Sequence, residues 1–137
     1  MDYAYKKCPG KGLCAVKGCR NRISAKKKDL CSRHHMRLWR SRNPVRAAYT
    51  TLKHHALARR KVFTLTFEEF QQIAELNRYI DGKGCTRLAL HMDRMDDRKG
   101  YEAGNIRVIT CGENVAKENR RRFVEYFRET DEEMNPF

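Results

Sequence analysis

The 137-residue chain is 40% hydrophobic and 34% charged, and its formal net charge is +13. This length suits one domain, or one small domain with a metal-stabilised appendage. No apolar run is long enough to cross a bilayer and the N-terminus lacks the apolar stretch of a signal peptide, so we expect a soluble protein of the cytoplasm. The six cysteines would be reduced in that compartment, which favours metal binding over disulfides.

The excess positive charge lies in the first part of the chain. Residues 1–60 carry 17 Lys or Arg side chains and two acidic ones, whereas residues 61–137 carry 13 and 15. A strong local positive field favours a polyanionic partner, and nucleic acid is the commonest polyanion. A basic segment kept for solubility is the alternative. Charge alone does not distinguish DNA from RNA, or binding from cleavage.

Three cysteines and a histidine near the N-terminus have the spacing of a zinc site. The pattern C-x4-C-x11-C-x2-H is formed by Cys14, Cys19, Cys31 and His34. The last pair is three residues apart, so both side chains can reach one ion from a single helical turn. Two close pairs of such ligands suit tetrahedral Zn²⁺ in a closed structural site. Cys8 and His35 fit the spacing less well, and unrelated free thiols are the alternative interpretation.

Two helices are expected between residues 43 and 83. Asn43 and Pro44 form a typical helix start, and the apolar face of the following segment predicts a helix to about residue 60. Thr66 and Glu69 form a capping box that starts a second helix with an apolar face ending at Leu76. We expect phosphate contacts from basic residues on and before the first helix, namely Arg40, Arg42, Arg46, Lys53, Arg59 and Arg60. A solvated helix face is the alternative.

The second half of the chain has the pattern of a ββα unit. Residues 88–93 alternate as a short strand, residues 94–104 form a polar loop with glycines, and residues 105–110 form a second strand. Thr110 and Glu113 form a second capping box, which opens a helix that continues through Phe127. Residues 129–133 are acidic, and we expect them to fray.

The residues of this unit resemble the HNH, or His-Me finger, family of ββα-metal endonucleases, most closely its phage-type branch. The resemblance rests on His91-Met-Asp-Arg-Met-Asp96, Gly100-Tyr101, Asn105-Ile-Arg-Val-Ile-Thr110 and Glu113-Asn114-x-x-Lys117. The nine-residue step from Asn105 to Asn114 is that of the family. Zinc modules similar to the N-terminal one often accompany such nucleases.

This resemblance implies an α+β protein in four parts. Residues 1–42 would be a basic zinc-binding module, 43–83 a helical linker or core region, 84–128 the nuclease unit and 129–137 an acidic tail. Hydrolysis of a phosphodiester needs an activated water, a metal that stabilises the leaving oxygen, and cations that neutralise the phosphate. By resemblance, Asn114 would bind Mg²⁺ or another divalent ion, and Asn105 would brace the loop and orient the base. Arg107 and Lys117 would contact phosphate.

The first strand departs from the adjacent Asp-His that is common in the family. If Asp93 takes the place of the family's Asp, the next residue is Arg94, and no histidine is left to act as the base. Arg94 is still a catalytic candidate. Its alternative role is structural, paired with Asp96 or Asp97. In the other register His91 is the base, but Leu90 then takes the usual acidic position.

His91 and Asp93 share one side of the expected strand. We therefore expect His91 as the base and Asp93, with Asn114, on the catalytic metal, while Asp96 is a reserve ligand. The alternative is that His91 is an ordinary strand histidine in a lapsed or differently built site.

The expected function is metal-dependent cleavage of duplex DNA that leaves 5′-phosphate and 3′-hydroxyl ends. One site would nick, and a double-strand break would need a homodimer or two events. A catalytically lapsed, zinc-containing DNA-binding or regulatory protein is the first alternative. A protein that binds or cleaves RNA is the second, although the chain lacks an aromatic-rich platform for single strands. The location would be the host cytoplasm if a phage encodes the chain.

Overall fold

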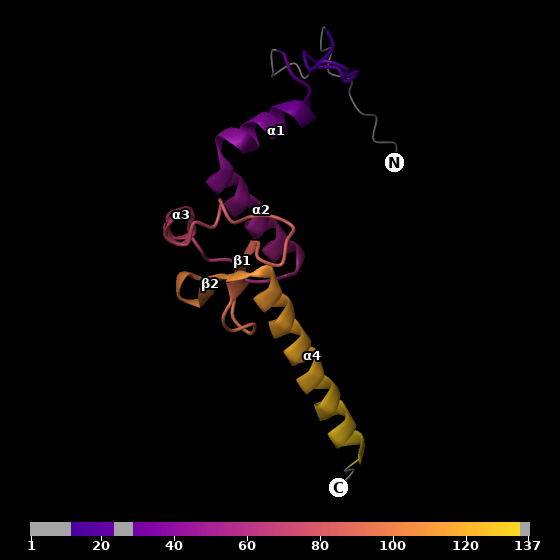
Figure 1. Ribbon diagram of the computed structural model, residues 1–137, viewed down its shortest axis with the longest axis vertical. Helices are drawn as coiled ribbons and strands as arrows, with labels where there is room; N and C mark the ends of the chain where they lie inside the picture. Colours follow the sequence, from indigo (N-terminus) through magenta and orange to yellow (C-terminus); the bar gives the residue numbers. More distant parts are fainter. Residues whose placement is uncertain (1–11, 24–28, 135–137) are drawn as a thin grey trace. The chain divides into compact units, whose positions relative to one another are not determined.

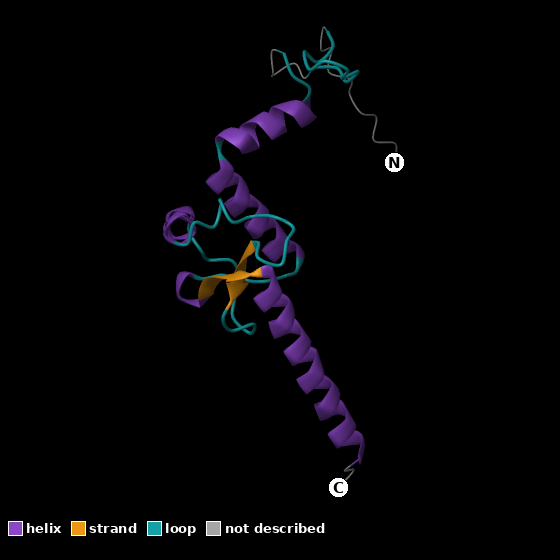
Figure 2. Cartoon of the chain, viewed as in Figure 1, coloured by secondary structure: helices purple, strands orange, loops and turns teal. Residues whose placement is uncertain are grey.

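The computed structural model describes residues 12–23 and 29–134 of the chain, which divides into two compact units, Met1–Ala47 and Ala48–Phe137. The elements are α1 (Ser32–Arg42), α2 (Pro44–Ala58), α3 (Phe67–Leu76), β1 (Leu90–Arg94), a 3-10 turn (Ala103–Asn105), β2 (Ile106–Thr110) and α4 (Cys111–Met134) (Figures 1 and 2). The α+β class is confirmed. Across residues 12–23 and 29–134, no helix combines the length and apolarity that a membrane span requires.

The first unit contains a short knuckle followed by α1. Leu13 and Arg22 form an antiparallel bridge, and the Cys14 amide donates to the Asn21 carbonyl at 2.9 Å. Between them the chain turns back at Gly18, whose φ of +79° is a conformation that favours glycine. Backbone hydrogen bonds, with few apolar groups, therefore define this knuckle.

α1 ends at Arg42 and α2 begins at Pro44, so a single residue, Asn43, joins the two helices. The backbone amide and the side-chain amide of Asn43 both donate to the Trp39 carbonyl, at 2.9 and 3.0 Å, and so close the end of α1. Pro44 then occupies the first position of α2, where its missing N–H costs no hydrogen bond. α2 ends at Ala58, close to the predicted limit, and the division between the units falls within it, after Ala47.

The core of the second unit is built from α2, α3 and the segment between them. Ala56, Phe70 and Leu65 are fully or almost fully buried. The Tyr49 ring packs edge-on against three phenylalanine rings at centroid distances of 5.5–5.6 Å, and its hydroxyl donates to the Leu65 carbonyl at 3.0 Å. Aromatic edge-to-face packing of this kind favours one arrangement of the helices over others. Residues 48–83, part of the predicted linker or core region, share a compact unit with the sheet.

The start of α3 was predicted correctly, and its apolar face only in part. Thr66 and Glu69 form the reciprocal capping box, and the pKa of Glu69 is lowered because the Thr66 backbone N–H donates to its carboxylate. Leu76, assigned to the apolar face, is 87% exposed because helical periodicity puts it well away from the side that carries the buried Phe70 and Ala74. That assignment was wrong.

β1 and β2 pair as a two-stranded antiparallel sheet, with His91 opposite Ile109 and Asp93 opposite Arg107. β1 begins at Leu90, two residues later than predicted. The β1–β2 loop is tied to the α2–α3 connection, since the Thr64 and Leu65 amides both donate to the Tyr101 carbonyl at 2.9–3.0 Å. The Tyr101 amide in turn donates to the Val62 carbonyl at 2.9 Å.

α4 follows β2 without an intervening loop. The predicted capping box is present, because the Thr110 hydroxyl accepts from the Glu113 amide at 3.2 Å and the Glu113 carboxylate accepts from the Thr110 amide at 2.8 Å. α4 continues to Met134, so the expectation of a frayed segment at 129–133 was wrong for the backbone. Ion pairs of Glu118 with Arg121 and Arg122, at 2.9 and 3.1 Å, support this extension on one side of the helix.

Candidate functional site

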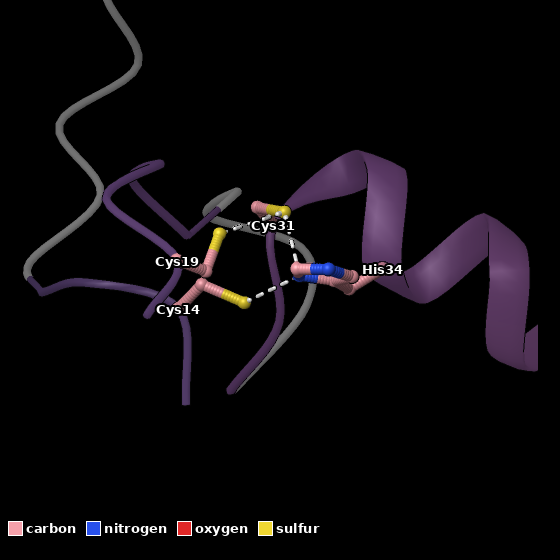
Figure 3. A group of neighbouring side chains, drawn as sticks. All are labelled: Cys14, Cys19, Cys31 and His34. Atoms are coloured by element: carbon pink, nitrogen blue, oxygen red, sulfur yellow. Dashed lines mark hydrogen bonds between the residues drawn. The ribbon is translucent and has the colours of Figure 1, made fainter. Parts of the chain in front are cut away.

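The four predicted zinc ligands meet in the first unit (Figure 3). Cys14 and Cys19 come from the knuckle, Cys31 precedes α1, and His34 lies in the first turn of α1. Their ligand atoms all lie within 4.8 Å of one another. Cys14 Sγ is 3.2 Å and Cys31 Sγ 3.5 Å from His34 Nδ1, and the Sγ atoms of Cys19 and Cys31 are 3.9 Å apart.

These separations fit a tetrahedral ion. A zinc with bonds of about 2.3 Å to sulfur and about 2.0 Å to nitrogen spaces its ligand atoms by roughly 3.5–3.8 Å. Cys14 and Cys31 are buried, and the backbone N–H of His34 lowers the pKa of Cys31, which favours the thiolate that binds metal. Four protein ligands leave no open position, so the cluster is consistent with structural zinc. Cys8 lies outside the described residues, and His34 rather than His35 reaches the cluster.

The predicted catalytic residues lie in the second unit, where β1 meets the first turn of α4. His91 points from β1 toward Asn114 of α4, and the His91 Nδ1 to Asn114 Nδ2 distance is 3.5 Å. Both side chains are half-buried. The pairing of β1 with β2 and the Thr110–Glu113 cap fix this approach, because α4 starts immediately after β2.

Asp93 has different neighbours from those expected. Its carboxylate accepts from Arg107 Nε at 3.0 Å and from Lys117 Nζ at 3.0 Å, and the residue is only 8% exposed. Lys117 Nζ also contacts Asp97 Oδ1 at 3.1 Å and donates to the Arg94 carbonyl at 2.5 Å. Both oxygens of Asp93 are thus engaged by cations, and the charges of Arg107 and Lys117 are directed at Asp93 instead of outward.

Arg94 supports the loop that follows β1. Its guanidinium donates to the carbonyls of Asp97 and Lys99 at 2.8 Å and lies 5.4 Å from the Tyr101 ring centre. Its side chain is only 12% exposed. These contacts correspond to the structural role of the two that were left open for Arg94, and its paired carboxylate is Asp97 at 3.6 Å.

Asn105 is buried beneath the same loop. Its Oδ1 accepts from the Asp96 amide at 2.8 Å, while its Nδ2 donates to the carbonyls of Asp96 and Gly100 at 3.0 Å. The side chain therefore closes the loop on itself. The Asp96 carboxylate is turned to the Arg98 amide at 2.9 Å.

A cleft of about 920 Å³ in the second unit is lined by α2, β1 and α4, and it includes His91, Asp93 and Asn114. Its walls also carry basic side chains, among them His55, Arg59, Lys61, Lys83, Arg121 and Arg122, together with the carboxylates of Asp97 and Glu118. Lys83 lies 5.2 Å from the Tyr79 ring centre, and burial lowers its pKa. This rim can neutralise a phosphate backbone beside His91.

The predicted phosphate contacts divide between the units. Arg40, Arg42 and Arg46 belong to the first unit, whereas Lys53, Arg59 and Arg60 are exposed on the second. Arg59 donates to the Tyr101 hydroxyl at 2.9 Å, so its guanidinium is held at the cleft. Lys61, Lys83, Arg121 and Arg122 were not predicted, because helical periodicity and charge do not reveal which residues line a cleft.

No protein-family model, curated protein or solved structure matches this chain.

Proposed function

We propose that this chain is a metal-dependent DNA endonuclease of the HNH type with an N-terminal structural zinc module. The observation that carries the proposal is the meeting of His91 and Asn114, 3.5 Å apart, in a cleft with a cationic rim. An imidazole beside a carboxamide, whose oxygen could bind a hard divalent ion, would combine a general base with a place for that ion. The long basic segment before this unit supplies further affinity for a polyanion.

His91 is the general base in this mechanism. Its neutral imidazole takes a proton from a water molecule, whose oxygen then attacks phosphorus. The bond from phosphorus to the 3′ oxygen breaks, which leaves a 5′-phosphate and a 3′-hydroxyl. A Mg²⁺ or similar ion held by Asn114 would stabilise the negative charge on the departing oxygen. Asn105 keeps the β1–β2 loop closed, so that β1 presents His91 at a constant position.

Cations along the cleft would hold the DNA strand. The cleft that contains His91 is lined by Arg59, directly after α2, and by Arg121 and Arg122 on α4. Each phosphate contact that forms releases counterions, so binding should weaken steeply as salt rises.

The ion pairs of Asp93 favour a second candidate function, in which the chain binds DNA without cleaving it. With Arg107 and Lys117 on its two oxygens, Asp93 can bind a divalent ion only if one of these ion pairs opens. If both pairs persist, the ion has Asn114 but lacks the carboxylate that was expected beside it. The second candidate function is therefore a zinc-containing DNA-binding or regulatory protein whose cleavage site has lapsed.

The deciding experiment compares the zinc-loaded full chain with His91→Ala in the nicking of supercoiled plasmid with Mg²⁺ or Mn²⁺. His54→Ala is the matched control, because His54 is an exposed histidine on α2 outside the residues that line the cleft. We expect His91→Ala to lower the nicking rate by about 10²- to 10⁴-fold, the usual contribution of a general base, and His54→Ala to leave it unchanged. The affinity for duplex DNA, measured by fluorescence anisotropy, should be equal in all three proteins.

Four outcomes would contradict parts of this proposal. Wild-type protein that binds duplex DNA in a salt-sensitive way but never nicks it supports the lapsed, DNA-binding function. Nicking that survives in His91→Ala would remove His91 as the base, and nicking that co-purifies unevenly with the protein would identify a contaminant. Stronger competition by structured RNA than by duplex DNA would instead support an RNA-directed protein.

A further inference from the structure

A small hollow lies beside the zinc cluster of the first unit. Its volume is about 330 Å³, and residues 16–21 of the knuckle, with Arg33 and His34 from the first turn of α1, form its walls. Two of the ligands drawn in Figure 3, Cys19 and His34, border it. This knuckle hollow shares no lining residue with the cleft that contains His91, so any ligand that it binds has a site of its own.

Three cationic side chains line the knuckle hollow. Lys17, Arg20 and Arg33 are all exposed, and none of the described residues on its walls is acidic. Asp29 is the single acidic residue between positions 3 and 67, and it does not line the hollow. No ion pair joins described residues within 12–23 and 29–42, whereas arginines and a lysine of the second unit are held by carboxylates. The three charges at the hollow are therefore available to a ligand.

The zinc cluster itself does not cancel these charges. Three thiolates around one Zn²⁺ carry a formal charge of about −1, against about +3 from the three side chains on the walls. The hollow stays net positive, which favours an anionic ligand. Support of the thiolates by these cations is the alternative role.

The walls of the knuckle hollow suit a phosphate group. A guanidinium offers forked donors that match two phosphate oxygens, and a lysine adds a compact charge. No Phe, Tyr or Trp is among the described lining residues, so the hollow offers no platform on which an unpaired base could stack. The knuckle turn is also open at Gly18, where an added Cβ would meet nothing within 4 Å. The chemistry therefore favours the sugar-phosphate backbone over the bases.

We propose that the knuckle hollow binds a phosphate of the DNA backbone through Lys17, Arg20 and Arg33. The contact positions the first unit on DNA without reading the sequence. This inference rests on the proposed affinity for DNA, but not on cleavage. A protein whose cleavage site has lapsed would use the hollow in the same way.

The experiment measures the affinity of the zinc-loaded full chain for a short labelled DNA duplex by fluorescence anisotropy, over a range of salt and without added Mg²⁺. Arg20→Ala with Arg33→Ala is compared with Arg22→Ala with Arg37→Ala. Each pair removes one arginine from the knuckle and one from α1, but Arg22 and Arg37 are exposed residues that do not line the hollow.

We expect the pair from the hollow to weaken binding by about tenfold or more, and the control pair by less than about threefold. The slope of log affinity against log salt concentration should become shallower by about 2 for the pair from the hollow, because two phosphate contacts are lost. Lys17→Gln, which leaves both arginines in place, should make the slope shallower by about 1.

Two further measurements separate DNA binding from other effects. The zinc content, measured by atomic absorption, should be the same in wild type and in every variant. The nicking rate at saturating DNA should also be unchanged, because His91 and its cleft are untouched.

Equal weakening by the two arginine pairs would overturn the inference, because the knuckle hollow would then contribute only to the general positive field. Loss of zinc from both the hollow pair and Lys17→Gln would assign these cations to the thiolates and overturn it too. Tighter binding of structured RNA than of duplex DNA would contradict the choice of DNA. Normal nicking with unaltered DNA affinity in the hollow pair would refute this inference and leave the endonuclease standing. Weakened binding in a chain that never nicks would support the hollow and refute the endonuclease.

Discussion

The ammonium group of Lys117 sits among oxygens of Asp93, Asp97 and the Arg94 backbone, and Lys117→Met would remove its charge while keeping most of its length. Losing one partner of a buried ion pair commonly costs about 3–5 kcal/mol, because the other charge stays buried. Asp93 keeps Arg107 as a partner, and the Lys117 side chain is 22% exposed. We therefore expect Lys117→Met to lower the free energy of unfolding of the second unit by about 2–3 kcal/mol.

Equilibrium urea unfolding at neutral pH, with zinc held constant, measures this cost. Trp39 is the single tryptophan and belongs to the first unit, so its fluorescence follows that unit alone. Near-ultraviolet circular dichroism of the buried Tyr79 and Tyr101 follows the second. Lys99→Met is the control, since Lys99 is an exposed lysine on the loop between the strands.

A double-mutant cycle with Asp97→Asn then measures the coupling within the cluster. The cost of Lys117→Met should fall when Asp97 is already neutral, because fewer charges remain to be compensated. The reasoning is refuted if Lys117→Met costs no more than Lys99→Met, or if the Trp39 transition shifts and the tyrosine transition does not.

Three further outcomes follow from the fold. Cys19→Ser should lose the bound zinc measured by atomic absorption and shift the Trp39-monitored transition far more than the tyrosine one; unchanged zinc content would contradict the cluster. The Thr110 backbone N–H lowers the pKa of Glu113 below its ordinary 4.5. The stability that the ionised Glu113 adds to the fold is therefore complete above that pH and is lost as the pH falls through the lowered value. Glu113→Gln should flatten this part of the acid-unfolding profile, and an unaltered profile would refute the cap. Gly100→Ala should destabilise the second unit more than Gly104→Ala in thermal unfolding, since an added Cβ at Gly100 would clash with the Val62 carbonyl, whereas at Gly104 it meets nothing within 4 Å; equal losses would contradict this packing.

The zinc cluster and the helix starts could be predicted because each depends on residues close together in sequence. Cys31 and His34 are one helical turn apart, and Thr110 reaches Glu113 through local hydrogen bonds. The α+β class followed from the change of hydrophobic period between the two halves of the chain. Such signals need no knowledge of how distant elements pack.

The surroundings of Asp93 could not be predicted, because they depend on two distant elements at once. Arg107 reaches Asp93 only in the observed β1–β2 register, and Lys117 only after α4 docks against β1. The resemblance to HNH nucleases implied that His91 and Asn114 would belong to one site, but not that Arg107 and Lys117 would both turn to Asp93. The assignment of Leu76 failed for a local reason instead, since helical periodicity puts it away from the side of Phe70 and Ala74.

The bonding of Tyr101 to the connection between α2 and α3 limits how this protein can be divided or recombined. Its backbone bonds Val62, Thr64 and Leu65, and its ring packs 5.7 Å from that of Phe63. A fragment that began at residue 84 would keep both strands and α4 but lose the partner of its main loop. A transplantable unit must therefore begin within or ahead of α2, and an exchange of modules between proteins would have to join the chain there.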